Sequence, residues 1–220
     1  MLETDLISTC LPGKTCEGCA KEQLLDTLHQ FAESLGEAID AKDPCTRFHS
    51  EQVAEVSAAI AREMGLSDHD VRMIHIAGHL HDIGKIGIPD AILRKTNFLT
   101  STEWEHIRTH PELGAIIVRP VEAFSPPGGV ADIILHHHEL YDGSGYPYGR
   151  SGTDIPLGSR IITVADALSA RMQHRPYRQG ARFDVAVRAI LHCAGTHYDP
   201  LVVSAFEAAV RELGERILTG

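Results

Sequence analysis

Hydrophobic residues recur every three or four positions along most of this chain, a spacing that is typical of amphipathic α-helices. No segment shows a convincing alternation of apolar and polar residues, which a half-buried strand would require. A long helix is expected from Lys21 to about Ala41, and a closing amphipathic helix from Leu201 to Ile217. The pattern therefore predicts an all-α fold. The apolar stripe of the first helix comprises Leu24, Leu28, Phe31, Leu35 and Ile39.

Local signals mark where two central helices begin and end. In each, a hydroxyl residue is followed three positions later by an acidic residue, which is the pattern of a capping box. Gly84 is expected to end the first of these helices. Pro111 is expected to break the second just after His110, because proline has no amide hydrogen to donate. The two capping signals are Ser67 with Asp70 and Thr100 with Glu103.

Five histidines and two aspartates lie at inward-facing helical positions, although a single buried histidine is usually only a hydrogen-bonded core residue. Burying so many unpaired polar groups would cost several kcal/mol apiece, and coordination of a metal ion removes that penalty. The aspartate of the adjacent His-Asp pair has two oxygens, enough to bridge two ions. The sequence therefore predicts a dinuclear metal centre inside a helical bundle. Its candidate ligands are His49, His81, Asp82, His110, His137, His138 and Asp166.

The other histidines are not expected to bind metal. His75 and His79 have the spacing of a zincin helix, but Ile76 stands where that chemistry needs a glutamate base, so a metalloprotease is rejected. His136 adjoins two candidate ligands at the margin of their stripe, and contact with the ligands' outer side or with solvent is expected. Surface positions are expected for His29, His69, His106, His174, His192 and His197.

Length and composition limit the number of domains and the class of partner. With 220 residues, of which 43% are hydrophobic, the chain can bury one sizeable core. We expect one helical domain over residues 21–220, preceded by a segment of residues 1–20 that carries three cysteines. The net charge of −10 argues against a nucleic-acid polymer or a membrane surface as partner, since polyanions are held by clustered Lys and Arg. The lack of a secretory signal and of a membrane-length apolar run predicts a cytoplasmic location.

Two long motifs carry a resemblance to a known family. The first is HDIGKIGIPD, from His81 to Asp90; the second is HHE, from His137 to Glu139, followed by DGSGYP from Asp142 to Pro147. Together with an intermediate histidine and a downstream aspartate, they resemble the HD-GYP family, a branch of the HD phosphohydrolase superfamily. The resemblance runs from about residue 43 to residue 200. It implies a single-domain helical bundle with the metal site in its core, which hydrolyses the bacterial second messenger cyclic di-GMP using iron or manganese ions.

The resemblance also implies a role for each matching residue. His49, His81, Asp82 and Asp166 would hold one ion, and Asp82, His110, His137 and His138 the other. Lys85 would act with Asp82 in catalysis and contact a phosphoryl oxygen or the leaving group. The residues expected to bind substrate are Lys85, Tyr146, Arg175 and Arg178.

Several positions depart from the family pattern. Three-metal members have a glutamate four residues before the first histidine, but Cys45 stands there, so we expect two ions. Between Asp166 and Arg175 the family usually has another acidic residue, then alanine and leucine. This chain has Ser169, Ala170 and Arg171 instead, which is expected to affect the edge of the pocket. A CxxC with one further thiol, formed by Cys10, Cys16 and Cys19, is weak evidence for a metal or redox site, and an unstructured tail is favoured.

The expected reaction is hydrolysis of cyclic di-GMP to pGpG, and in a further step to GMP, by a hydroxide that the metal pair activates. Ligands of nitrogen and oxygen without thiolate favour iron, manganese or similar ions. Two alternatives remain open. One is a catalytically weak cyclic-dinucleotide sensor or a protein-interaction module, with a diguanylate cyclase as partner through the Gly-Tyr-Pro loop; the other is a hydrolase of another phosphoester, such as cyclic GMP-AMP. The complete set of candidate ligands favours catalysis. A homodimer is left open.

Overall fold

The computed structural model describes residues 17–43, 48–174 and 179–217. Within these ranges the chain forms helices and no strand, apart from one isolated bridge between Ala194 and Tyr198, which confirms the predicted all-α fold. None of the described helices combines the length and apolar character needed to cross a membrane. The helices are α1 (Glu17–Lys42), α2 (His49–Glu63), α3 (Asp68–Leu80), η1 (Ile83–Gly87), α4 (Asp90–Leu93), α5 (Ser101–Ile107), α6 (His110–Val118), η2 (Glu122–Phe124), α7 (Val130–His136), η3 (Gly152–Asp154), α8 (Leu157–Met172), α9 (Phe183–His192) and α10 (Pro200–Ile217).

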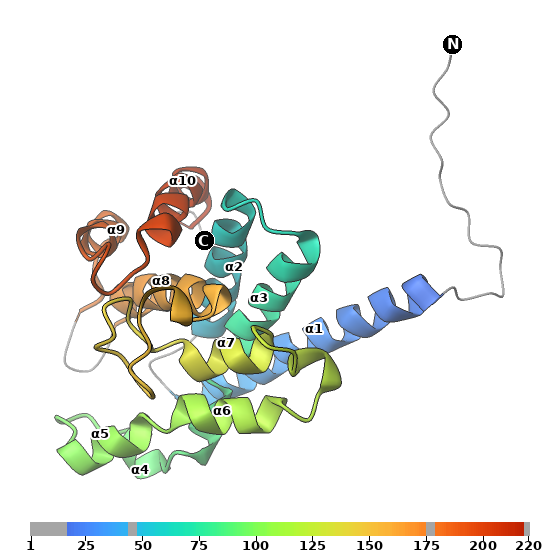
Figure 1. Ribbon diagram of the computed structural model, residues 1–220. Coiled ribbons are helices and arrows are strands. Elements are labelled where there is room, and N and C mark those ends of the chain that lie inside the picture. Colours follow the sequence, from blue (N-terminus) through green and yellow to red (C-terminus); the bar gives the residue numbers. More distant parts are fainter. Residues whose placement is uncertain (1–16, 44–47, 175–178, 218–220) are drawn as a thin grey trace.

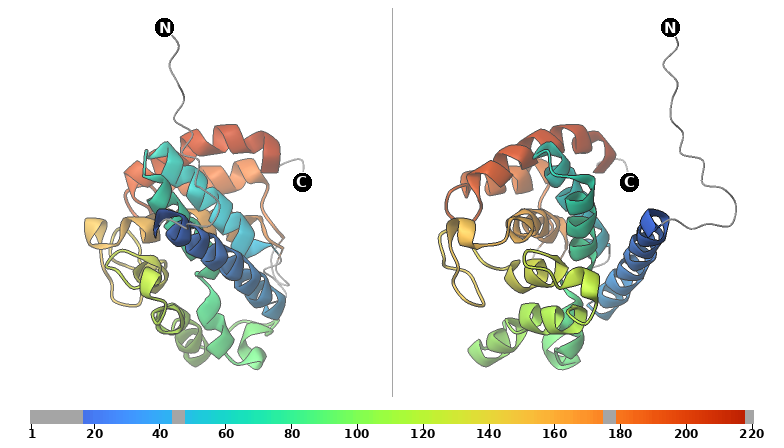
Figure 2. Two further views of the ribbon diagram at one scale, coloured as in Figure 1. Left: turned by 90° about the vertical axis from the view of Figure 1, so that its right-hand side faces the viewer. Right: turned by 45° about the vertical axis from the view of Figure 1, so that its right-hand side comes forward.

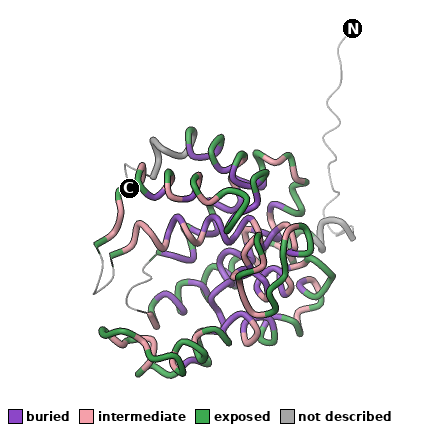
Figure 3. Tube along the Cα trace, turned by 60° about the vertical axis from the view of Figure 1, so that its left-hand side comes forward, coloured by how far each residue is buried: buried purple, intermediate pink, exposed green. Residues whose placement is uncertain are grey.

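The core lies between α2, α3, α7 and α8, which pack against one another at the centre of the bundle (Figure 1). Helix α8 is buried along most of its length, and the tube in Figure 3 shows buried positions running through the middle of the molecule. Helix α10 covers α2 and α8, and α6 packs on α7 and η1. Helix α1 lies across α3 and α2, and its amino-terminal half projects away from the bundle (Figure 2).

The long helix predicted near the amino terminus is confirmed as α1, but its packing face differs from the expected stripe. Leu24, Phe31 and Leu35 are exposed, whereas Ala32 and Ile39 are buried. The contact face carries small residues because α1 and α3 approach closely. A Cβ atom on Gly36 would lie 2.7 Å from the carbonyl oxygen of His79.

Both predicted capping signals mark helix starts, but only Thr100 with Glu103 forms the complete capping box. Ser67 Oγ accepts a hydrogen bond from the amide of Asp70 at the start of α3, with an N···O distance of 3.2 Å. Thr100 and Glu103 cap the start of α5 reciprocally, each side chain accepting from the other's backbone amide. These short-range signals placed both helix starts because the hydrogen bonds involve residues only three positions apart.

The two predicted helix ends were wrong. Helix α3 ends at Leu80, four residues before Gly84, which lies inside η1. Pro111 does not end a helix after His110. Instead α5 ends at Ile107, and His110 begins α6 with Pro111 in its first turn, where the missing amide hydrogen has no intrahelical partner to lose.

Two glycines allow segments to approach more closely than any other residue would permit. A Cβ atom on Gly84 would lie 1.9 Å from the carbonyl oxygen of His110, so η1 rests directly on the start of α6. A Cβ atom on Gly78 would lie 2.6 Å from the Cα atom of Ala54, so α3 rests on the backbone of α2. The first contact places the segment after α3 against the start of α6, and the second places α3 against α2.

We predict that Gly78→Ala destabilises the fold. Alanine favours an exposed helix by about 1 kcal/mol over glycine, but here its methyl group meets backbone atoms of α2 that cannot move independently. The free energy of unfolding, measured by urea denaturation, should fall by about 1–3 kcal/mol. Gly87→Ala is the matched control, since its methyl group meets only the flexible side chain of Leu113. A Gly78→Ala protein as stable as the wild type would contradict this packing.

Candidate metal centre

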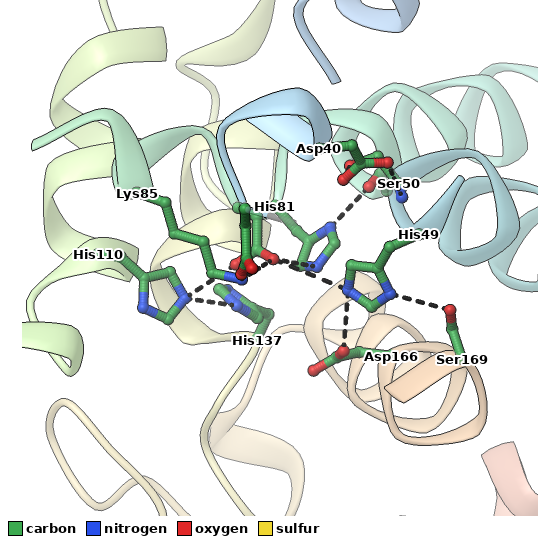
Figure 4. A network of polar contacts seen from close by, with 12 residues as sticks. Asp40, His49, Ser50, His81, Lys85, His110, His137, Asp166 and Ser169 are labelled. Carbon is green, nitrogen blue, oxygen red and sulfur yellow. Dashed lines mark hydrogen bonds and ion pairs between the residues drawn. The ribbon is translucent and has the colours of Figure 1, made fainter. Parts of the chain in front are cut away.

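The seven predicted ligands converge from five different helices. His49 and His110 begin α2 and α6, His81 and Asp82 directly follow α3, and the His137–His138 pair directly follows α7. Asp166 lies within α8, which crosses the centre of the bundle. Figure 4 shows side chains from these separate elements pointing toward one another. The structure thus brings together every residue that the sequence singled out as a ligand, in two groups with Asp82 between them.

The first group consists of His49, His81 and Asp166. One potential ligand atom of each lies within 4.8 Å of those of the other two. His49 Nε2 is 3.3 Å from Asp166 Oδ1, and the rings of His49 and His81 are 5.1 Å apart between centroids. Both histidines are buried.

The second group consists of His110, His137 and His138, whose ligand atoms also lie within 4.8 Å of one another. The Nε2 atoms of His110 and His137 are 3.2 Å apart. His138 lies beside both rings, with centroid distances of 5.0 Å to His110 and 4.1 Å to His137.

Asp82 lies between the two groups and turns one oxygen toward each. Its Oδ1 is 3.3 Å from His110 Nε2, and its Oδ2 is 3.4 Å from His81 Nε2 and 3.7 Å from His49 Nε2. The side chain is only 6% exposed, so water contributes little to its solvation. A carboxylate in this position has the geometry to bridge two cations.

Hydrogen bonds fix the orientation of four of the imidazole rings. In each, Nδ1 is engaged on the outer side: His81, His110 and His137 face the carbonyl oxygens of Gly78, Ile107 and Ile134 at 2.6–2.7 Å. His49 Nδ1 is 2.9 Å from Ser169 Oγ, which itself donates to Gln52 Oε1. Since carbonyl oxygens only accept, the Nδ1 atoms carry the protons and the Nε2 lone pairs point inward.

This arrangement gathers hydrogen-bond acceptors that face one another without a hydrogen between them. The Nε2 atoms of His110 and His137 form one such contact, and Nε2 of His81 is buried without a hydrogen-bond partner. Leaving such groups unpaired is costly in a buried site, and cations satisfy them. The donor set of imidazole nitrogen and carboxylate oxygen therefore fits divalent metal ions.

The pKa shifts keep these groups in the forms that bind cations. Burial opposes ionisation of Asp82, but the charge of the Lys85 ammonium group outweighs it and holds the pKa of this carboxyl well below its usual range. Burial also opposes ionisation of Asp166, whose pKa is nevertheless lowered through its contact with His49. Burial lowers the pKa of His110 to about 3 and lowers that of His137 as well.

Lys85 is the one cation that directly contacts this cluster in the described part of the chain. Its Nζ is 2.7 Å from Asp82 Oδ2 and 3.5 Å from Asp43 Oδ2. Burial alone would favour the neutral amine, but these two carboxylates raise the pKa of Lys85, so it stays charged. Lys85 therefore lies beside Asp82, and its part in catalysis stays a prediction.

Sequence reasoning missed Lys42, which holds the segment that carries Lys85. The Nζ atom of Lys42, in the last turn of α1, donates to the carbonyl oxygens of Lys85, Ile86 and Ile88 at 2.9–3.1 Å. An ammonium group bound to three carbonyls adds charge-assisted hydrogen bonds to the poorer 3₁₀ hydrogen bonds of η1. No local pattern marks this residue, because its partners lie more than forty positions away.

The loop after His138 was also expected at the site, and a buried carboxylate that was not predicted to act holds it there. Glu139 accepts hydrogen bonds from the amides of Tyr148 and Arg150 at 2.9 and 3.1 Å. Tyr146 stacks on His138 with a centroid distance of 4.8 Å. Arg108 from the turn after α5 lies 4.9 Å from the centroid of the Tyr146 ring and lines a surface hollow of about 380 Å³ with Ser101, Trp104 and Glu105.

Some expectations were wrong or fall outside the described residues. His136 does not reach solvent: it is buried, and its Nδ1 lies 3.7 Å from Glu139 Oε1. His29 is half-buried and contacts His75, whereas the exposed positions expected for His69, His106, His174, His192 and His197 are confirmed. Arg175, Arg178, Cys10, Cys16 and Cys45 lie outside the described residues, as does the side chain of Cys19.

Comparison with known proteins gives a family and relatives of known activity. A family model for the HD domain matches residues 33–202. The cyclic di-GMP phosphodiesterase of Thermotoga maritima is 40% identical over 189 residues, which cover 86% of this chain and 51% of that protein. The 3′3′-cGAMP-specific phosphodiesterase 3 of Vibrio cholerae is 37% identical over 186 residues, covering 84% and 40%. This chain therefore spans at most about half the length of these curated relatives.

A solved structure shares the fold. The crystal structure of a cyclic GMP-AMP specific phosphodiesterase of V. cholerae superposes with a TM-score of 0.65 at 20% identity, covering 87% of this chain and 53% of that one. The chain belongs to the HD domain family, and its resemblance to the HD-GYP branch is confirmed.

Proposed function

We propose that this chain hydrolyses cyclic di-GMP to pGpG at a centre of two divalent metal ions. The observation that carries the proposal is the position of Asp82, whose two carboxylate oxygens face two separate groups of ligand atoms. A phosphodiester anion resists attack by water, and a reaction on it needs positive charge held at a fixed place. A shared carboxylate between two groups of inward-facing donors supports such a site.

One ion would be held by His49, His81, Asp82 and Asp166, and the other by Asp82, His110, His137 and His138. Bound divalent ions would neutralise the charge of the phosphodiester and lower the pKa of a water molecule at neutral pH. Iron and manganese are the proposed metals, because the donors are nitrogen and oxygen without thiolate. Water would add to phosphorus as the bond from phosphorus to the ribose oxygen breaks, and the departing oxygen takes up a proton.

Lys85 and the Gly-Tyr-Pro loop would contact the parts of the substrate that the metal ligands do not reach. The Lys85 ammonium lies against Asp82 and would stabilise a phosphoryl oxygen or the departing oxygen. Tyr146 holds the ring of His138 by stacking, and Arg108 beside it places a guanidinium at the edge of the surface hollow. A guanine base of the substrate would contact Tyr146. Arg175 and Arg178 are proposed to bind the substrate phosphates.

Cyclic GMP-AMP is the second candidate substrate, because a relative that is 37% identical is named for it. The two substrates share the phosphodiester ring and differ in one base. The rates at which the purified protein hydrolyses cyclic di-GMP and cyclic GMP-AMP, measured side by side by chromatography of the products, decide which substrate is preferred. The same chromatograms show whether pGpG is hydrolysed further to GMP.

The wider setting is proposed from the sequence. We propose one helical domain over residues 21–220, preceded by a cysteine-bearing segment of residues 1–20. We also propose a cytoplasmic location and a diguanylate cyclase as a partner that binds the Gly-Tyr-Pro loop. A homodimer is tested by light scattering. A sensor that binds cyclic di-GMP without cleaving it is the alternative function.

Asp82→Ala, in protein prepared without oxygen and loaded with Fe²⁺ or Mn²⁺, tests the shared carboxylate. Removing the bridging carboxylate should remove both ions and reduce cyclic di-GMP hydrolysis to background. Metal analysis and chromatography of the nucleotide products measure the two effects. Asp68→Ala, at the exposed opposite end of α3, is the control and should keep both. Undiminished hydrolysis by Asp82→Ala would exclude the mechanism, and a metal-loaded wild type that binds cyclic di-GMP but never cleaves it would favour the sensor.

Lys85→Met separates catalysis from metal binding. Lys85 contacts Asp82 but offers no ligand atom while it is charged, so the variant should keep its metal ions and lose about 10²–10³-fold in kcat. Lys95→Met, whose ammonium pairs with Glu103 on α5, should leave kcat unchanged. A Lys85→Met enzyme with wild-type kcat would rule out the role assigned to this side chain.

Ser169→Ala tests the outer support of the centre. The serine oxygen accepts the Nδ1 proton of His49, and loss of such a partner typically weakens metal binding about 10–100-fold. Calorimetric titration with Mn²⁺ measures this change. Ser57→Ala is the matched control, because Ser57 is a buried serine on α2 whose hydroxyl makes no hydrogen bond. Equal affinities for the Ser169→Ala and Ser57→Ala proteins would show that Ser169 does not orient His49.

A further inference from the structure

A second cluster of histidines lies where α1 crosses α3. His29 comes from α1, and His75 and His79 are one turn apart on α3. One nitrogen atom of each ring lies within 4.8 Å of those of the other two. The ring centroids are 4.8 Å apart for His29 and His75, 4.8 Å for His75 and His79, and 5.8 Å for His29 and His79. The three rings therefore surround a common point.

The contacts of His75 are those of a metal-binding histidine. Its Nδ1 lies 2.8 Å from His29 Nε2, inside the cluster, and its Nε2 lies 3.2 Å from Glu55 Oε1, outside it. A histidine that binds a metal ion through one nitrogen commonly donates the proton on its other nitrogen to a carboxylate. Without an ion, a proton on His29 Nε2 can bridge to His75 Nδ1, and a metal ion would take the place of that proton.

The cluster is separate from the centre around Asp82. A helix turns by about 100° per residue, so His79 and His81, two positions apart, leave α3 on nearly opposite sides. His81 points to Asp82, whereas His79 lies beside the rings of His29 and His75. The two sites share α3 but no side chain.

Burial and charge around the cluster suit a cation that enters from solvent. His79 is buried, His29 and His75 are half-buried, and Glu55 is exposed, so the cluster opens on one side. Glu55 supplies a negative charge at that opening. Three imidazoles at this spacing cannot all be protonated without repelling one another, and the neutral ring is the form that binds metal.

We propose that His29, His75 and His79 form a second metal site, which binds Zn²⁺ or a similar late transition-metal ion with Glu55 as the outer partner of His75. Three imidazoles with one open position are a common ligand set for zinc, and imidazole suits copper and nickel as well. The carboxylates of the centre around Asp82 instead favour harder ions. The ion would cross-link α1 to α3.

The cross-link would act on the segment next to the catalytic residues. Helix α1 ends at Lys42, which holds the carbonyl oxygens of Lys85, Ile86 and Ile88, and Asp40 accepts two hydrogen bonds from Ser50 at the start of α2. Pinning α1 to α3 by an ion would stabilise these contacts. The ion is therefore expected to stabilise the fold without taking part in hydrolysis.

The test counts zinc in the full chain. Four proteins are saturated with Zn²⁺, desalted and analysed for metal: the wild type, His75→Gln, His29→Gln and the control His69→Gln. His69 is an exposed histidine on α3, the helix that carries His75. We expect His75→Gln and His29→Gln to hold one ion per chain fewer than the wild type and His69→Gln. Glu55→Gln should keep the ion with an affinity about 10–100-fold lower. The Tm of the wild type and of His69→Gln should rise on adding Zn²⁺ more than that of His75→Gln.

Two further measurements can contradict the second metal site: the absorption spectrum of the Co²⁺-loaded protein and the metal content of His29→Gln. The Co²⁺-loaded wild type should show a visible absorption band that His75→Gln lacks, and this signal does not depend on hydrolysis. If circular dichroism shows that His75→Gln does not fold, the number of zinc ions per chain in His29→Gln tests the second site instead, because His29 lies at the rim of the cluster. Folded His75→Gln or His29→Gln protein with as much zinc and the same cobalt spectrum as the wild type would overturn the second site.

Discussion

The structure of this domain depends on one buried carboxylate that is shared by two groups of side chains. Asp82 is almost inaccessible to water, and its oxygens face nitrogen atoms of His49 and His81 on one side and of His110 on the other. Burying an ionised group is costly unless opposite charge compensates it. In the described residues, Lys85 is the cation in direct contact with Asp82. The other neighbours of this carboxylate are imidazole Nε2 atoms, whose lone pairs point inward. The geometry is therefore most stable with cations bound.

The bundle makes this arrangement possible by placing helix ends, rather than helix faces, around Asp82. Ligands at the ends of α2, α3, α6 and α7 have carbonyl oxygens or side chains behind them that hold each ring by its Nδ1. Thr163 of α8 donates to the carbonyl oxygen of His137, so the helix that carries Asp166 also fixes the second group. Gly84 removes the side chain that would separate η1 from α6. The packing of the helix ends thus fixes the positions of the candidate ligands.

The sequence predicted the features that depend on short-range pattern. Helical periodicity gave the all-α fold, capping residues gave two helix starts, and adjacent polar residues on apolar faces gave the seven candidate ligands. It did not predict where α3 and α5 end, and a short-range pattern also cannot show the contact between Gly84 and the start of α6. The same limit hid Lys42 and the contact of His29 with His75, whose partners are distant along the chain. Periodicity also misjudged the outer face of α1, where Phe31 is exposed.

The central claim is that two metal ions share Asp82, and X-ray absorption spectroscopy of the iron- or manganese-loaded protein tests it most directly. Two ions bridged by one carboxylate should give metal–metal scattering at about 3.5–4 Å, with a first shell of nitrogen and oxygen ligands. Asp82→Ala protein examined in the same way should lack the metal–metal feature. A fully loaded wild type whose spectrum shows isolated metal ions, without scattering between them, would contradict the account.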